Sequence, residues 1–356
     1  MNQTKKHASL TPFQESKTTK ILLGMLVLFA VGFILHLLGS IFKPLLIALL
    51  FSFVLEVPIN LMRKIKIPKI IAIIVVLIIT FVLLYLIGLL IYSNIDLFAA
   101  DFPRYQTKFN ELYLKIIKSL KIPHENIIQY YSHINWSELL QKLSIPKIIS
   151  SSVGSFITFL VNLFLVLLFT VYILLGREHL ISRVAQAFPG ERSEKFYRVF
   201  ENINRGVQKY LVAKAIISIG TGLSAAIILL IFGVDFAWIW GLLTFILNFI
   251  PNIGSVIATL PPILVAIFQF GRLFPAVWVA ILLVATQMIW GNVIEPAVMG
   301  KSLNMSPLVV IVSLIFWGFI WGPIGMILAI PISSSIQIVC ANIESLKPIS
   351  VLMGED

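Results

Sequence analysis

The strongest constraint on this chain is its series of long apolar runs, which recur from Ile21 to Cys340. Several runs exceed about 18 residues, the length that marks a candidate transmembrane helix. Only 12% of the residues are charged, whereas a soluble chain averages about 25%. A membrane β-barrel would show short alternating segments in place of continuous runs. The sequence therefore predicts an all-α polytopic membrane protein.

Charge and motifs narrow the function classes. The formal net charge is +11, but the basic residues cluster beside apolar runs, which favours contact with anionic membrane lipids over nucleic acid. The single cysteine, Cys340, excludes an intramolecular disulfide and most thiolate metal sites. The chain contains no His-Glu-x-x-His, Gly-x-Ser-x-Gly or Walker motif. We therefore expect a non-enzymatic protein without a cofactor, and any transport to be passive or coupled to an ion gradient.

Two apolar segments near the C-terminus, 236–269 and 307–340, are each interrupted near the middle. An unbroken helix over 307–340 would be roughly 50 Å long, against a hydrocarbon core of about 30 Å. Proline removes a backbone donor and crowds the preceding turn, so helices break at such positions. The interrupting residues are Pro251, Gly254, Gly322, Pro323 and Gly325. We predict two helical hairpins; the alternative is that both breaks are loops between ordinary tilted spans.

The remaining composition divides the chain into about six full transmembrane helices and several polar segments. In chain order we expect a cytoplasmic tail at 1–20, N-terminal transmembrane helices within 21–92 that turn at Lys43-Pro44, an extracytoplasmic helical cap at 93–152, a transmembrane helix at 153–175, a cytoplasmic amphipathic helix at 176–209, and a C-terminal core at 210–345 that holds both hairpins. The amphipathic helix should lie in the membrane interface, because one face is aromatic and aliphatic and the other basic.

The distribution of lysine and arginine sets the expected orientation. Basic residues stay on the cytoplasmic side, which places the basic loop at 63–69 and the segment 176–209 inside, together with both termini. Exactly one span separates the two hairpins, so they should enter the membrane from opposite sides. The hairpins therefore form an inverted pair, whether each crosses the bilayer fully or turns back.

Polar residues at membrane depth gather around the two breaks. They are Asn248, Asn252, Gln287, Asn292 and Glu295. Amides can hydrogen-bond a polyhydroxylated solute, and the helix after Pro251 presents unsatisfied N–H groups at its start. Glu295 is a candidate proton or cation carrier. The alternative is that each amide joins helices by hydrogen bonding, and that Glu295 is a carboxylate at a helix end beside the interface.

Glu56 is a second carboxylate within a predicted span and a second candidate proton or cation carrier. It lies about two turns before Arg63 and Lys64. An acid at the membrane interface is therefore the alternative reading of this residue.

Several motifs of the C-terminal half resemble the autoinducer-2 exporter family of bacterial inner-membrane transporters. They are Phe249-Ile250-Pro251-Asn252-Ile253-Gly254, Gly291-Asn292-Val293-Ile294-Glu295-Pro296, Met305-Ser306-Pro307 and Trp321-Gly322-Pro323-Ile324-Gly325-Met326. The Asn-Val-Ile-Glu-Pro and Trp-Gly-Pro-Ile-Gly-Met forms are most similar to the branch named for transport of quorum-sensing signal A. The N-terminal half is similar mainly in hydropathy.

The resemblance implies export of small signalling molecules such as autoinducer-2, and some family members are associated with sodium/proton exchange. Two other functions stay open at this point. One is a cation/proton antiporter that uses Glu295 or Glu56, and the other is a non-transporting scaffold that holds partners through the cap at 93–152. Substrate, direction, coupling ion (proton or sodium) and oligomeric state, including a homo-oligomer, are open as well.

Overall fold

The computed structural model describes residues 17–119, 152–187, 190–299 and 305–354, and these contain helices and no strand. Seven helices among them are long and apolar enough to cross a membrane. The predicted all-α polytopic class is confirmed. Residues 120–151 of the predicted cap lie outside the described residues.

The N-terminal half consists of long helices. Their bounds are α1 (Lys17–Leu37), α2 (Gly39–Lys64), α3 (Lys69–Ser119), α7 (Ser152–Ala187) and α8 (Glu191–Ile231). At about 1.5 Å per residue, α3 and α8 are roughly 75 and 60 Å long, about twice the hydrocarbon thickness or more. Both helices therefore extend well beyond a bilayer.

The C-terminal half contains shorter helices that reverse direction repeatedly. Their bounds are α9 (Ala237–Leu247), α10 (Ile253–Phe270), α11 (Leu273–Met288), a π-helical turn (Ile289–Ile294, called the π turn), α12 (Glu295–Met299), α13 (Pro307–Trp321), α14 (Pro323–Ala341) and α15 (Lys347–Met353). We call α9–α10 hairpin 1 and α13–α14 hairpin 2. Both helical breaks fall where the sequence predicts them.

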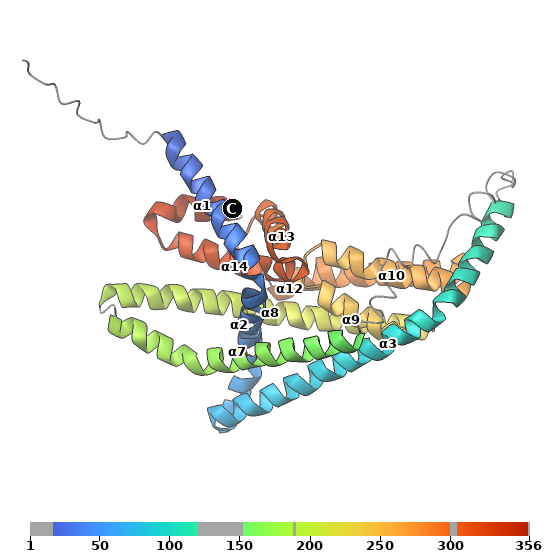
Figure 1. Ribbon diagram of the computed structural model, residues 1–356, viewed down its shortest axis with the longest axis horizontal. Helices are drawn as coiled ribbons and strands as arrows, with labels where there is room; N and C mark the ends of the chain where they lie inside the picture. Colours follow the sequence, from blue (N-terminus) through green and yellow to red (C-terminus); the bar gives the residue numbers. More distant parts are fainter. Residues whose placement is uncertain (1–16, 120–151, 188–189, 300–304, 355–356) are drawn as a thin grey trace, which may run out of the picture.

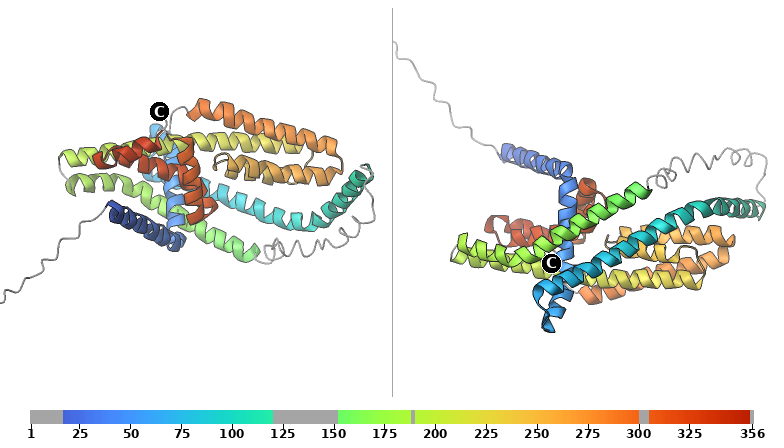
Figure 2. Two further views of the ribbon diagram at one scale, coloured as in Figure 1. Left: turned by 90° about the horizontal axis from the view of Figure 1, so that it is seen from above. Right: turned by 60° about the horizontal axis from the view of Figure 1, so that its bottom comes forward.

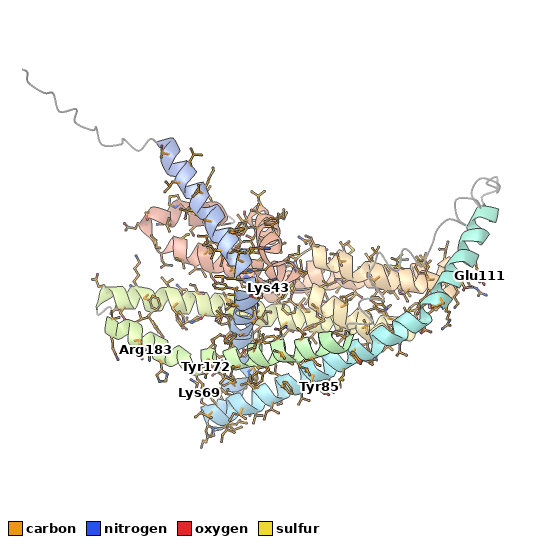
Figure 3. The ribbon with its side chains drawn as sticks, in the orientation of Figure 1. Lys43, Lys69, Tyr85, Glu111, Tyr172 and Arg183 are labelled. Carbon is orange, nitrogen blue, oxygen red and sulfur yellow. The ribbon has the colours of Figure 1, made fainter. Side chains whose placement is uncertain are left out.

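The helices are arranged along one long axis (Figure 1). Hairpin 1 and α11 lie toward the far end of α3, whereas hairpin 2 lies toward the end where α7 meets α8. Figure 2 shows α2 crossing α7 at a steep angle in two further views. Figure 3 places Glu111 of α3 and Arg183 of α7 near opposite ends of the molecule, with Tyr85 and Tyr172 between them. The two hairpins thus lie toward different ends of this long axis.

The joint between α1 and α2 differs from the predicted turn at Lys43-Pro44. Helix α2 runs unbroken through Pro44 and also contains Pro58, and the chain changes helix at Leu38. Hairpin 2 fixes this joint, because Trp321 Nε1 donates to the Leu35 carbonyl (3.0 Å) and His36 Nδ1 to the Ile320 carbonyl (2.8 Å). Proline close to a helix start removes only one hydrogen bond, so tertiary contacts decide where the helix begins.

Two predicted segments fall within longer helices. The cap predicted to begin at residue 93 starts inside α3, which continues to Ser119. The segment 176–209, predicted as an amphipathic helix in the interface, contains the end of α7, Gly190 (φ +86°) and the first half of α8. The polar part of each helix is therefore continuous with an apolar part of the same helix.

The two hairpins close by the same device. A Cβ on Gly254 would lie 1.8 Å from the Leu247 carbonyl oxygen, and a Cβ on Gly325 would lie 1.8 Å from the Trp317 carbonyl oxygen. Four residues later each second leg carries a fully buried alanine, Ala258 and Ala329. Both breaks therefore need a glycine where the second helix starts against the end of the first.

The turns of the hairpins require residues with positive φ. Asn252 has φ +58° and Gly322 has φ +67°, and asparagine and glycine adopt positive φ more readily than most residues. Pro251 precedes Asn252 with φ restricted near about −65°. The residues that interrupt the helices in the sequence are thus the ones that make these turns possible.

The far end of α3 is bonded to the base of hairpin 1. Tyr105 is 5% exposed, and its hydroxyl donates to Asp235 Oδ2 at 2.8 Å. Asp235 N donates to Gln269 Oε1 at 2.8 Å, and Lys108 Nζ donates to the Gln269 carbonyl. Tyr105 belongs to one buried cluster with Val265 of α10, among other residues. These contacts hold both ends of hairpin 1 against α3.

Tyr105→Phe should weaken this attachment. Loss of the hydroxyl leaves the half-buried Asp235 carboxylate without this donor, which should lower the free energy of unfolding by about 1–3 kcal/mol. Burial, and then the bond to Asp235, raise the pKa of Tyr105 above its ordinary value of about 10. The stability due to the neutral phenol is therefore complete below about pH 10 and is lost at higher pH.

Thermal unfolding of the purified protein between neutral pH and about pH 11 measures this effect. Wild type should lose stability above about pH 10, and Tyr105→Phe should lose less. Tyr197→Phe, on an exposed tyrosine of α8, is the matched control. Equal stability of Tyr105→Phe and wild type at neutral pH would mean that the bond to Asp235 contributes nothing.

Candidate functional site

The structure brings the candidate polar residues of the sequence to one cavity. Asn248, Asn252, Gln287, Asn292 and Glu295 all line a cavity of about 670 Å³, within the range of about 300–1,000 Å³ that is typical of ligand pockets. Its walls come from α8, hairpin 1, α11, the π turn and α12. The cavity therefore lies against the break of hairpin 1 and the polar end of α11.

Hairpin 1 contributes the turn and one wall of the cavity. Pro251 and Asn252 come from the turn, and Ser255 and Thr259 from the first turns of α10. Side-chain hydroxyls already bond to the backbone here, since Ser255 Oγ donates to the Asn252 carbonyl (2.8 Å) and Thr259 Oγ1 to the Ser255 carbonyl (2.6 Å). Their oxygens keep acceptor capacity toward the cavity.

Asn248 combines a structural contact with its place in the cavity. Its side chain is buried, and Nδ2 donates to Ser218 Oγ of α8 at 3.0 Å. This is the interhelical bond that was the alternative reading of each amide. Asn252 and Asn292 are exposed, so their amides are open to a solute or water. The five residues therefore differ in role although they share one cavity.

Lys214 and Glu295 form an ion pair at the cavity wall. Lys214 Nζ lies 2.6 Å from Glu295 Oε1, and the two side chains are 3% and 24% exposed. Lys214 comes from the middle of α8 and Glu295 from the first residue of α12, so the bond joins two distant parts of the chain. A buried ammonium requires such a partner, because desolvating an unpaired charge is very costly.

The π turn at Ile289–Ile294 places Asn292 in the cavity. In an α-helix, residues five apart differ by roughly 140° around the axis, at 3.6 residues per turn, which would separate Asn292 from Gln287. A π turn closes hydrogen bonds between residues five apart and so brings such residues toward one face. Gln287 and Asn292 both line the cavity. Single π turns within α-helices occur frequently at functional sites.

Hairpin 2 is absent from the described lining of this cavity. The tips of the hairpins meet instead through apolar contacts: Ile250 is 3% exposed and shares a buried cluster with Trp317, Trp321 and Leu328. Gly322, Pro323 and Gly325 therefore shape hairpin 2 without lining the cavity. Ile250 itself lines the cavity, so it separates the polar space from hairpin 2.

Glu56 lies elsewhere in the structure. Gln208 Nε2 of α8 donates to Glu56 Oε2 (3.2 Å) and to the Phe53 carbonyl (3.0 Å), both on α2. Glu56 is not among the described residues that line the cavity. The two candidate carrier carboxylates are therefore not brought together.

The sequence matches a known family of transporters over most of its length. The model of the AI-2E family transporters matches residues 23–345. This chain belongs to the AI-2E transporter family. It is 30% identical over 343 residues to the AI-2 transport protein TqsA of Escherichia coli K12, covering 94% of this chain and 95% of TqsA.

Two further relatives have the same extent. The "Putative transport protein YhhT" of E. coli K12 is 28% identical over 97% of both chains. A "Putative transport protein" of Borreliella burgdorferi is 29% identical over 88% of this chain and 85% of its own. The AI-2E family is a family of membrane transporters and permeases, so this chain is a multi-pass membrane transporter.

Lys214 is the residue of this AI-2E transporter site that motif reasoning misses. It lies inside the apolar run at 210–232, and a charged residue inside such a run is a functional candidate by default.

 Lys214 is the only charged residue between Tyr210 and Phe232. Its pairing with Glu295, 81 positions away, is a long-range contact that no local pattern reveals.

The π turn rests on a close contact with α8. Trp290 Nε1 donates to Ser224 Oγ at 3.2 Å, and a Cβ on Gly220 would lie 2.1 Å from Trp290 Cη2. Gly220→Ala should therefore push the indole away and shift the π turn that carries Asn292. We expect a loss of about 1–3 kcal/mol in the free energy of unfolding, as for overpacked cores, together with slower transport.

Thermal unfolding and transport by the same preparation measure both effects. Gly206→Ala is the matched control on α8, because its new Cβ would meet only Ile338 Cδ1 at 3.8 Å. Wild-type transport by a folded Gly220→Ala protein would show that the position of Trp290 does not matter to the site.

Proposed function

We propose that this AI-2E family member is a secondary transporter of the bacterial inner membrane that exports a small, polar, hydroxyl-rich solute of the autoinducer-2 type. The observation that carries the proposal is the convergence of amides, hydroxyls and one ion pair on a single cavity beside the break of hairpin 1. The name of TqsA, at 30% identity, supports the solute class. The basic segments at 63–69 and 176–209 support cytoplasmic termini.

The chemistry of the cavity suits a solute that both donates and accepts hydrogen bonds. Each amide offers two N–H donors and a carbonyl acceptor, and each hydroxyl offers one donor and acceptor lone pairs. Asn252 and Asn292 are exposed on two different walls, hairpin 1 and the π turn. A polyhydroxylated solute between these walls would satisfy groups that otherwise need water.

The hairpins supply a means of access in this proposal. Loosened backbone at membrane depth is tolerated only beside protein or a water-filled cavity, and paired interrupted helices mark binding sites in many secondary transporters. Ile250 closes the cavity on the side of hairpin 2 through apolar contacts. Movement of one hairpin tip against the other would open that side, because no covalent or polar bond joins Ile250 to hairpin 2.

Autoinducer-2 transport by proteoliposomes tests the proposal. Asn292→Leu removes a donor and an acceptor from the cavity and should slow transport about tenfold, the effect of roughly 1.4 kcal/mol. Glu295→Gln should slow it at least as much, because it also leaves Lys214 without its counter-charge. Both variants should be compared at equal amounts of folded protein.

Two substitutions on α8 serve as controls. Asn202→Leu makes the same chemical change on an exposed face, and Glu201→Gln breaks the exposed pair with Arg205. Neither should alter the transport rate. If Asn292→Leu and Glu295→Gln transport at the wild-type rate while folded, these residues have no part in the mechanism.

A further inference from the structure

Lys214 and Glu295 are the only formally charged groups among the described residues that line the cavity. Their charges cancel, and the pair is made by direct contact at 2.6 Å. The remaining polar lining is neutral and consists of amides and hydroxyls: Asn248, Asn252, Ser255, Thr259, Gln287 and Asn292. The described wall of the cavity therefore carries no net charge.

The ammonium of Lys214 is held more firmly than the carboxylate that it neutralises. Its side chain is 3% exposed, against 24% for Glu295, and it rises from α8, which packs tightly against hairpin 1 through Gly222 and Gly241. A lysine ammonium is a compact point charge on a long stem. It can therefore occupy the place that a bound metal cation would take beside a carboxylate.

We infer that Lys214 is a tethered counter-cation for Glu295, so that the cavity needs no bound sodium and accepts an uncharged, hydroxyl-rich solute. The solute part of this inference rests on the proposed function. An anionic solute would have to displace Glu295 from Lys214, and a cationic one would have to displace Lys214 from Glu295. Either exchange breaks a partly buried ion pair, whereas an uncharged solute leaves it intact.

Thermal unfolding of the purified protein in sodium chloride and in choline chloride, at equal ionic strength, tests the tethered charge. A ligand that binds the folded state raises the melting temperature, so a sodium site shows as a higher Tm in sodium. Wild type and Lys214→Arg, which keeps the positive charge, should melt equally in both salts. Lys214→Met exposes the carboxylate and should become more stable in sodium than in choline.

The double variant Lys214→Met with Glu295→Gln is the control for the new response. It removes both charges with side chains of similar size and should again melt equally in both salts. A sodium-specific rise in the Tm of wild type that Glu295→Gln abolishes would overturn the inference, because Glu295 would then bind a cation despite Lys214. A Lys214→Met protein that is indifferent to sodium would overturn it as well.

Wild type and Glu295→Gln show whether Glu295 binds sodium beside Lys214, even when Lys214→Met does not fold. The salt experiment requires no transported solute, so its outcome is separate from that of the proposed function. A wild type that ignores sodium but fails to transport autoinducer-2 would refute the solute and keep the tethered charge. A wild type that transports autoinducer-2 but binds sodium at Glu295 would keep the solute and refute the tethered charge.

Discussion

Lys214→Met should lower the free energy of unfolding by about 3 kcal/mol and abolish solute transport. Removing one member of a buried ion pair costs about 3–5 kcal/mol, because the other charge is left without compensation. The lower end applies here, since Glu295 is 24% exposed and keeps some hydration. Chemical unfolding in detergent, followed by circular dichroism, measures the stability, and proteoliposome flux measures the transport.

The double variant Lys214→Met with Glu295→Gln separates stability from function. Replacing both charges by neutral groups is often close to neutral for stability, so most of the lost free energy should return while transport stays low. Arg205→Met is the surface control: its pair with Glu201 is exposed, with the arginine 76% exposed, and such pairs contribute at most about 1 kcal/mol. Equal losses for Lys214→Met and Arg205→Met would contradict a buried pair at the cavity.

Gly254→Ala and Gly325→Ala should each destabilise the protein by more than about 4 kcal/mol, a loss that is exceptional for a single substitution. In both cases the added methyl would lie 1.8 Å from a backbone carbonyl oxygen of the first leg. A backbone atom cannot turn away as a flexible side chain does, so the two legs of the hairpin must separate. We expect little folded protein and no transport from either variant.

Gly206→Ala provides the matched control for these substitutions. It adds the same methyl within a helix, where the nearest heavy atom outside that helix is a side-chain carbon at 3.8 Å, and alanine favours helix by up to about 1 kcal/mol over glycine. Yield and Tm of the three variants compare the sites directly. A Gly254→Ala or Gly325→Ala protein with the wild-type Tm would show that the close contact is not needed to form the hairpin.

The parts of this fold that the sequence predicts correctly have local causes. Pro251 and Gly322 interrupt apolar runs, and proline and glycine act on their own turn of backbone, so both hairpins can be predicted from the sequence. The cavity residues can be predicted as a group because they flank one break and one polar helix end. Their individual roles cannot, since Asn248 bonds to Ser218 across helices.

The parts that the sequence does not predict depend on distant contacts or on helix continuity. A change from apolar to polar composition marks the edge of a bilayer and not the end of a helix, so α3 and α8 run through the predicted boundaries. Trp321 and Ile320 of hairpin 2 fix the joint after α1 by bonding to Leu35 and His36. The π turn is a backbone pattern without a side-chain signature.

The most direct test of the cavity is thiol labelling of Asn292→Cys and Val293→Cys in membranes, each with Cys340→Ala to remove the native cysteine. A thiol reacts as the thiolate, which forms in water and not in lipid. Val293 is 63% exposed on the isolated chain but does not line the cavity. A water-soluble methanethiosulfonate should label Asn292→Cys quickly and Val293→Cys slowly. Equal labelling of both, or no labelling of Asn292→Cys, would contradict a water-filled solute cavity at this place in the fold.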